Sequence, residues 1–217
     1  MTYKNKLKSL LTPAEQKLFA KLSTPNKIQD YLDAMPNNVL HSHEHTMRSP
    51  RRVMRDRKAH CMEGAMLAVA ALAYHGRPPI LLGLEATAGD YDHIVALFKE
   101  GGRWGAISKT NYPVLRWRDP VYLNVRELVM SYFHEYFLDS GRKTLRRYSA
   151  PFNIQKYDPA RWLTTEEDVD WLAEELGEAK HFPIAPPATI KKLRKASKIE
   201  VETTVTREWT RGGKKLF

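Results

Sequence analysis

Apolar residues in the first third of the chain recur at helical spacing, and Ser or Thr residues stand where the predicted helices would begin. Thr12 and Glu15 have the spacing of a capping box, and Thr24-Pro25 opens a second apolar face. Ser49-Pro50 opens a short, very basic helix. The stretch from about Ala59 to Tyr74 is apolar nearly all round, so we expect a helix that is buried on most sides.

The hydrophobic pattern then becomes strand-like. "PILLGLEA" predicts a short buried strand. "DHIVALFKE" and "RWGAISK" flank Gly101-Gly102, and apolar runs on either side of a Gly-Gly pair are typical of a β-hairpin.

The remainder of the chain predicts mostly helix. "LNVRELVMSYFHEYF" has helical spacing, and "TTEEDVDWLAEELGEAK" predicts a capped acidic helix. "HFPIAPPA" is typical of a proline-rich linker. "KIEVETTVTREW" alternates, which predicts an exposed strand.

This order of elements favours an α+β fold. We expect the buried, cysteine-bearing helix to pack on a small antiparallel sheet of two or three strands, with added helices at both ends. The chain divides into an N-terminal helical segment (1–48), a core (49–150), an acidic helix with a proline-rich linker (151–188) and a basic C-terminal tail (189–217).

The composition is that of a globular protein with a positive surplus. Of 217 residues, 42% are hydrophobic and 28% charged, and the formal net charge is +10. Segment 189–217 holds nine Lys or Arg residues but three Glu. This predicts either a solvated basic tail or a surface that binds nucleic acid or an acidic partner.

The sequence predicts no membrane association. No apolar run reaches the roughly 20 residues that a spanning helix needs, and the N-terminus becomes charged too early for a signal peptide. The single cysteine excludes an internal disulfide and suits a reducing compartment, so we expect a cytoplasmic location.

That cysteine, Cys61, stands where the buried helix begins. Free backbone N–H groups and the helix dipole favour thiolate there, and thiolate is the nucleophilic form. His93 heads the strand "HIVALF" and is the best candidate for a partner base. The alternatives are that Cys61 is a small buried hydrophobe and that His93 is a satisfied core or edge histidine.

Two blocks of sequence resemble the transglutaminase-like (papain-like cysteine) superfamily. "AHCMEGAMLAVAALAYHGRPPILLGL" is similar to its opening, in which a catalytic cysteine begins a buried helix. "DHIVALFKEGGRWGAISK" is similar to its second block, in which a histidine starts one strand and a Trp-marked strand returns. The resemblance covers about a quarter of the chain and is closest to an uncharacterised bacterial branch. It implies that Cys61 is the nucleophile, His93 the general base and 49–150 a transglutaminase-like core.

The third position departs from the pattern of that superfamily. Counted from Trp104, the expected aspartate falls on Ser108, whose hydroxyl can accept a hydrogen bond but carries no negative charge. Asn111 is near enough to orient His93 instead, and Asp90 and Asp92 are further alternatives.

Other residues are candidates for binding. Tyr112, Arg116 and Trp117 form an aromatic and basic cluster that, with Trp104, is our candidate for the substrate-binding residues. His60 is an unlikely base for Cys61, because consecutive helical residues point about 100° apart.

Two further groups have a more structural interpretation. Glu63 is expected to pair with Arg51 or Arg52, since a buried charge needs a partner. The run His41, His43, His45 is best explained as a solvated loop, so we expect no metal site and no cofactor.

Two functions remain open. The first is cysteine-dependent acyl transfer on an acyl or peptide substrate, by hydrolysis of an amide or ester or by transamidation. The second is a catalytically inactive transglutaminase-like protein that uses a basic surface to bind nucleic acid or an acidic partner.

Overall fold

One antiparallel sheet organises the molecule. The computed structural model describes residues 1–38, 46–210 and 212–217. Within them the strands are ordered β4-β3-β2-β1-β5-β7, and a short strand, β6, also pairs with β1. The strands are β1 (Ile80–Ala86), β2 (His93–Glu100), β3 (Arg103–Ile107), β4 (Arg118–Tyr122), β5 (Leu145–Ser149), β6 (Phe152–Asn153) and β7 (His181–Pro183).

The predicted hairpin sets the register of the central strands. Gly101 and Gly102 both have positive φ, as a tight two-residue turn requires, and Glu100 pairs with Arg103 across it. On the other side of β2, His93 pairs with Leu84 of β1. The first residue of β2 therefore lies near the C-terminal end of β1, at one end of the central strands.

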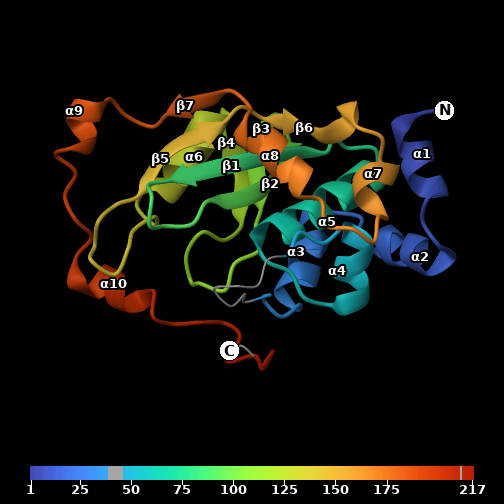
Figure 1. Cartoon of the computed structure of the whole chain (residues 1–217), viewed down its shortest axis with the longest axis horizontal. Helices are drawn as coiled ribbons and strands as arrows, with labels where there is room; N and C mark the ends of the chain where they lie inside the picture. The colour runs from blue at the N-terminus through green and yellow to red at the C-terminus, as the bar shows by residue number, and fades with distance from the viewer. Residues whose placement is uncertain (39–45, 211) are drawn as a thin grey trace.

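Helices cover both faces of the sheet (Figure 1). Helix α5 (Cys61–Tyr74) packs on β1 and β2, and α1 to α4 surround it. Helix α6 (Val125–Phe133) packs on the opposite face, against Leu82, Val95 and Leu97. The other helices are α1 (Tyr3–Ser9), α2 (Pro13–Lys21), α3 (Pro25–Asp33), α4 (Pro50–Asp56), η1 (Ile154–Lys156), α7 (Ala160–Leu163), α8 (Asp170–Gly177), α9 (Pro187–Ile190) and α10 (Lys198–Thr203).

Helix α5 is the centre of the larger apolar cluster. Residues 62–74 are all buried, which leaves Cys61 as the one residue of this helix that is partly exposed. A fully buried Leu, Val or Met side chain stabilises the fold by roughly 1.5–3 kcal/mol. Such burial along the whole helix anchors the N-terminus of α5, and so the position of Cys61.

The α+β class is confirmed, as is the packing of the cysteine-bearing helix on an antiparallel sheet. Thr12 and Glu15 form the expected capping box, and the helices that follow Thr24 and Ser49 begin at Pro25 and Pro50. The sheet is larger than expected because β4, β5 and β7 are short and carry no clear apolar alternation.

Three segments differ from their expected structure. The run that begins at Lys198 is helix α10 and not a strand, because Ser197 and Glu200 form a capping box at its start. His181–Pro183, within the expected linker, is strand β7 and pairs with β5. The acidic helix begins only at Asp170, because the preceding residues contact α4 instead: Ser49 donates to the Thr165 carbonyl and Arg55 pairs with Glu166.

Candidate active site

Cys61 is the first residue of α5, and two imidazole rings contact its thiol. Burial alone would raise the pKa of Cys61, but hydrogen bonds from His60 and His93, together with the charges of both rings, hold this pKa well below its usual value. His93 is the first residue of β2, at the end of that central strand which faces the start of α5. A thiolate at a helix N-terminus between two imidazoles is an activated nucleophile.

Ser108 fixes the tautomer of His93. His93 Nε2 lies 2.7 Å from Ser108 Oγ, and Ser108 Oγ lies 2.6 Å from the carbonyl oxygen of Leu115. A carbonyl only accepts, so the hydroxyl donates its single proton to Leu115 and accepts from His93 Nε2–H. The neutral ring of His93 therefore presents the lone pair of Nδ1 to the thiol, as a general base must.

The carbonyl at the end of this chain of hydrogen bonds is itself held in place. Leu115 has a φ of 60°, a conformation that non-glycine residues rarely adopt. Its N–H donates to Glu135 Oε2 at 2.7 Å, and Arg118 pairs with the other oxygen of Glu135 at 2.7 Å. A strained residue held by a partly buried network is common where a side chain must be aimed.

Helix α3 clamps the backbone around Ser108. The Gln29 amide accepts from Ser108 N–H at 2.9 Å and donates to the Ser108 carbonyl at 2.8 Å. The ammonium group of the next residue, Lys109, donates to the carbonyls of Leu32 and Met35 at the end of that helix. Burial is the main cause that lowers the pKa of Lys109 to about 8. The N-terminal helices therefore form part of the support of the site.

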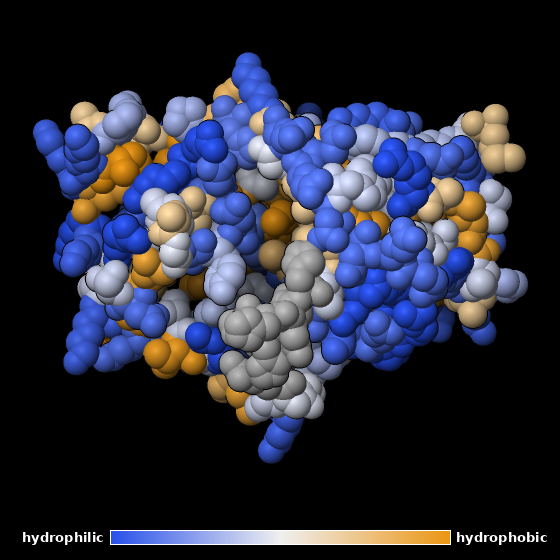
Figure 2. Space-filling model, viewed as in Figure 1, coloured by the Kyte–Doolittle hydropathy of each residue, from blue (hydrophilic) through white to orange (hydrophobic). Residues whose placement is uncertain are grey.

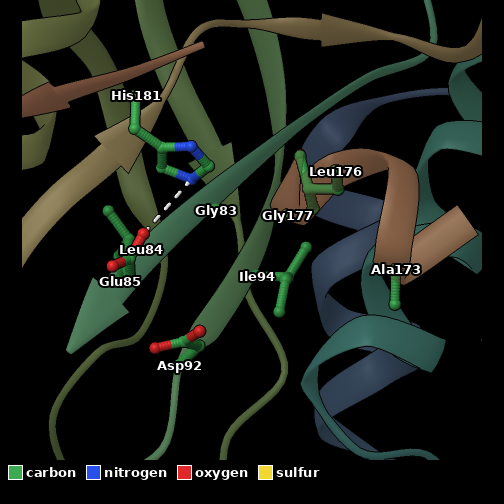
Figure 3. Close-up of a pocket in the computed structure, with 9 residues that line it drawn as sticks. All are labelled: Gly83, Leu84, Glu85, Asp92, Ile94, Ala173, Leu176, Gly177 and His181. Carbon is green, nitrogen blue, oxygen red and sulfur yellow. Dashed lines mark ion pairs between the residues drawn. The ribbon is translucent and has the colours of Figure 1, made fainter. Parts of the chain in front are cut away.

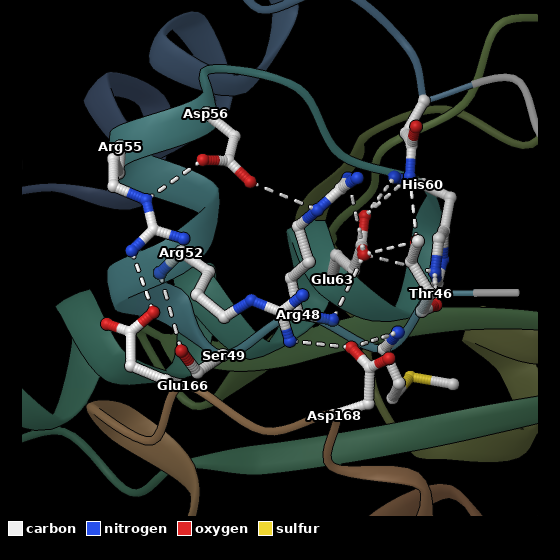
Figure 4. Close-up of polar contacts among 12 residues, drawn as sticks. Thr46, Arg48, Ser49, Arg52, Arg55, Asp56, His60, Glu63, Glu166 and Asp168 are labelled. Carbon is white, nitrogen blue, oxygen red and sulfur yellow. Dashed lines mark hydrogen bonds and ion pairs between the residues drawn. The ribbon is translucent and has the colours of Figure 1, made fainter.

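His60 belongs to a polar network around Glu63 (Figure 4). It is the N-cap of α5, with an extended backbone, so the helical geometry that made it an unlikely partner does not apply. Its Nε2 lies 2.7 Å from the Thr46 carbonyl and 3.5 Å from Glu63 Oε1. Burial opposes its charge, but the thiol of Cys61 and the carboxylate of Glu63 raise its pKa to about 9. That His60 is an unlikely base for Cys61 stays a prediction.

Glu63 is the centre of this network. Its carboxylate is fully buried and accepts from the backbone N–H groups of His60 and Arg48 and from the side chains of Thr46 and Asn38. Its ionic partner is Arg48, at 3.7 Å. Glu63 was expected to pair with an arginine such as Arg51 or Arg52; the arginine is Arg48, because those two side chains pair with Glu15 and Asp168.

Asn111 does not take the third position. Its amide donates to the carbonyl of Trp209 and accepts from the Trp209 N–H, so both ends of the side chain anchor the C-terminal segment. Asp90 accepts from Thr144 and Asp92 from the N–H of Ala86. Of the four alternatives, Ser108 is the one that the structure places against His93.

The four expected substrate-binding residues have other partners in the structure. Trp104 pairs with Lys99, which is six residues along β2 from His93 and so roughly 20 Å away. Trp117 stacks on Phe98 with ring centroids 5.0 Å apart. Tyr112 lies under the guanidinium of Arg207, and Arg116 pairs with Glu208 at 2.5 Å. The C-terminal segment therefore occupies Tyr112 and Arg116, and packing within the sheet occupies the two tryptophans.

A shallow pocket is lined in part by Asp92 and Ile94, the chain neighbours of His93, although neither His93 nor Cys61 lines it (Figure 3). Gly83, Ile94 and Leu176 form its apolar wall, and Glu85, Asp92 and His181 form its polar side. Burial is the main cause that raises the pKa of Asp92, and the charges of Glu85 and Cys61 add to it. Because these residues come from β1, β2, α8 and β7, no local sequence pattern could have indicated the pocket.

Other expectations concern metals and membranes. His41, His43 and His45 lie outside the described residues. In the described part of the chain, no group of three His, Cys, Asp or Glu side chains is placed to hold a metal ion. Across those same residues, no helix has both the length and the apolar character to cross a bilayer.

No protein-family model matches this sequence, and a search of curated proteins found no significant match.

Proposed function

We propose that the protein catalyses cysteine-dependent acyl transfer at Cys61. The observation that carries this proposal is the chain of contacts from the Cys61 thiol through His93 and Ser108 to the Leu115 carbonyl. Each member has the chemistry that its place requires: a nucleophile with a lowered pKa, a base of defined tautomer, and a neutral group that orients the base. Ser108 and His93 are buried, and Cys61 is less buried than the residues that follow it in α5.

The reaction follows from these positions. Cys61 Sγ transfers its proton to His93 Nδ1 and attacks the carbonyl carbon of an amide or ester. The oxygen gains the electron pair and is stabilised by the Cys61 N–H at the start of α5. The His93 imidazolium then gives its proton to the departing nitrogen or oxygen, which leaves a thioester on Cys61.

In the second half of the reaction, the thioester is cleaved and His93 again acts first as a base. His93 Nδ1 takes a proton from a water molecule, whose oxygen attacks the thioester carbonyl, and Cys61 leaves as thiolate. An amine in place of water would give a new amide.

This arrangement supports the resemblance to the transglutaminase-like superfamily. A cysteine begins a buried helix, the helix packs on an antiparallel sheet, and a histidine begins a central strand of that sheet. Ser108, at the position where the resemblance expects an acid, contacts this histidine. We therefore propose that residues 49–150 form a transglutaminase-like core with serine in the third position.

Acylation of Cys61 by p-nitrophenyl acetate tests the proposed function. We expect a burst of p-nitrophenol and an acetyl group on Cys61, identified by mass spectrometry of the digested protein. His93→Ala should abolish the burst at neutral pH, whereas His134→Ala, which removes an exposed histidine, should leave it unchanged. A wild-type protein that this ester does not acylate would contradict the proposal.

The alternative, a binding protein with a basic surface, stays a prediction. Figure 2 shows a broad hydrophilic area over α4, but Arg51, Arg52 and Arg55 of that helix pair with Glu15, Asp168 and Glu166. If the alternative holds, a fluorescent oligonucleotide should bind with an affinity that falls steeply with salt. Weak binding that is insensitive to salt would exclude it.

A further inference from the structure

One cavity lies at the opposite end of the central strands from His93. Ile80 pairs with Leu97 and Lys99 pairs with Trp104, and successive residues of a strand alternate in direction, so these four side chains point to the same face of the sheet. It is the face on which α6 packs. The cavity has a volume of about 140 Å³, and its remaining lining comes from Arg77, Pro78 and Phe98.

The rest of the fold leaves the apolar side of this cavity partly uncovered. Helix α6 packs against Leu82 and Val95, further along the same strands. Ile80 and Trp104 border that apolar cluster but are only half-buried. Contacts within the sheet therefore occupy part of the Trp104 indole, and the part left over lines the cavity. A ligand that covers this surface gains hydrophobic free energy.

The rim of the cavity carries a positive charge. The ammonium group of Lys99 lies 5.2 Å from the centroid of the Trp104 ring, within the range of a cation–π contact. Within the described part of the chain, no carboxylate pairs with Lys99. Arg77, the other cation of the lining, pairs with Glu100 at 2.8 Å. Lys99 is therefore the charge that an anionic ligand would neutralise.

The volume of the cavity suits one six-membered ring. An engineered protein cavity of about 150 Å³ binds benzene, and this cavity is nearly as large. A flat ring has two favourable neighbours here, the apolar surface of Ile80 and Leu97 and the indole of Trp104, since aromatic rings pack well in offset or edge-on pairs. A negative group on such a ring would find its partner in Lys99.

We propose that this cavity binds a small aromatic carboxylate, whose ring lies against Ile80, Leu97 and Trp104 and whose carboxylate pairs with Lys99 Nζ. The site is separate from Cys61, because Lys99 and Trp104 lie roughly 20 Å along the sheet from His93. The sequence grouped Trp104 with the residues that bind the substrate of Cys61, and this proposal assigns it to a binding site of its own.

Titration of the ¹⁵N-labelled protein with benzoate at pH 7 and low salt tests the proposal. Benzoate should shift the amide signals of Ile80 and Lys99 and the indole N–H signal of Trp104, and the shifts should saturate. Benzyl alcohol has the ring without the charge, and benzylammonium has the opposite charge. We expect the affinity to fall in the order benzoate, benzyl alcohol, benzylammonium. Acetate, which has the charge without the ring, should give no saturable shift.

Two variants separate the charge from the ring. Lys99→Met removes the charge but keeps an unbranched side chain. An exposed ion pair is a weak interaction, so this variant should bind benzoate about two- to fivefold more weakly and benzyl alcohol as before. Lys17→Met is the matched control, since Lys17 is an exposed lysine on α2, and should change neither affinity. Trp104→Leu should weaken the binding of both ligands by about two- to tenfold, because the aromatic partner is lost.

The wild-type series decides the question even if a variant does not fold. The proposal is wrong if benzoate gives no saturable shift, if its shifts lie away from this cavity, or if benzylammonium binds as tightly as benzoate. Each of these results concerns this cavity alone, so it leaves the proposed function at Cys61 as it stands.

Discussion

Replacement of Gln29 by glutamate should make the stability of the protein depend on pH in a defined direction. Wild-type Gln29 is 6% exposed, accepts from Ser108 N–H at 2.9 Å and donates to the Ser108 carbonyl at 2.8 Å. Gln29→Glu keeps the shape and the acceptor. The donor is lost when the new carboxyl group ionises, and a carboxylate oxygen then faces the carbonyl oxygen of Ser108.

The magnitude follows from that contact. A buried polar group left without its partner costs about 1–3 kcal/mol, and more when charge is involved. We therefore expect Gln29→Glu to be less stable than wild type by at least about 1–3 kcal/mol at pH 8. At acid pH the protonated carboxyl group can donate to Ser108 as the amide did, so most of this deficit should disappear.

The sign is that of a group whose folded pKa is raised by burial, by the facing carbonyl and by the carboxylate of Asp33, to which Gln29 Nε2 also donates at 2.9 Å. Its favourable contribution is fully present below the unfolded pKa of about 4.3 and is lost as the pH rises through the higher folded pKa. Urea unfolding of both proteins at a series of pH values from 4 to 8 measures the difference in the free energy of unfolding. A loss of stability that is equal at all pH values, or larger in acid, would refute the pair of hydrogen bonds between Gln29 and the Ser108 backbone.

Three other changes test the structural account. Ser108→Ala removes the acceptor of His93 Nε2–H and leaves two buried groups unpaired, so it should cost about 1–3 kcal/mol in urea unfolding; it should also slow acylation of Cys61, and an unchanged rate would show that the hydroxyl does not orient the ring. Gly64→Ala places a Cβ 2.5 Å from Lys109 Cβ, and overpacking of this kind should destabilise by about 1–3 kcal/mol, seen as a lower Tm; no change would contradict the close packing of α5. Asn111→Ala removes both hydrogen bonds to Trp209 and should speed trypsin cleavage of the C-terminal segment while the Cys61 alkylation midpoint stays unchanged; equal cleavage would contradict this anchor.

The central geometry of the site was accessible from the sequence because it depends on short spacings. A lone cysteine before a buried helix, and a histidine at the head of a hairpin strand, place two side chains at element ends that pack together. Ser108 comes directly after β3, and the antiparallel register of β2 and β3 places it close to His93.

The environment of His60 differs from the expected one because the start of α5 was placed about two residues too early. A helix that begins near Ala59 places His60 inside it, with its ring turned away from Cys61. The helix begins at Cys61, so His60 is the N-cap and its ring is free to turn toward the thiol. Helix boundaries are the least certain part of a pattern, and here two residues decide the chemistry.

The supports of the site could not be predicted because they join distant segments. Gln29 and Ser108 are 79 residues apart in the chain, and Asn111 and Trp209 are 98 apart. Leu115 adopts a conformation that its residue type does not favour, so nothing in its neighbourhood signals the carbonyl that Ser108 needs. The C-terminal segment, with a capping box inside an alternating pattern, shows how a local polar pair overrides periodicity.

The most direct test of the account is the pH dependence of Cys61 alkylation by iodoacetamide in wild type and in His93→Ala. The account predicts a wild-type midpoint well below the ordinary thiol value of about 8.5, since His60 and His93 lower the pKa of Cys61. It also predicts a clear rise of that midpoint when His93 is lost. A midpoint near the ordinary value in both proteins would contradict the claim that this cysteine and histidine work together.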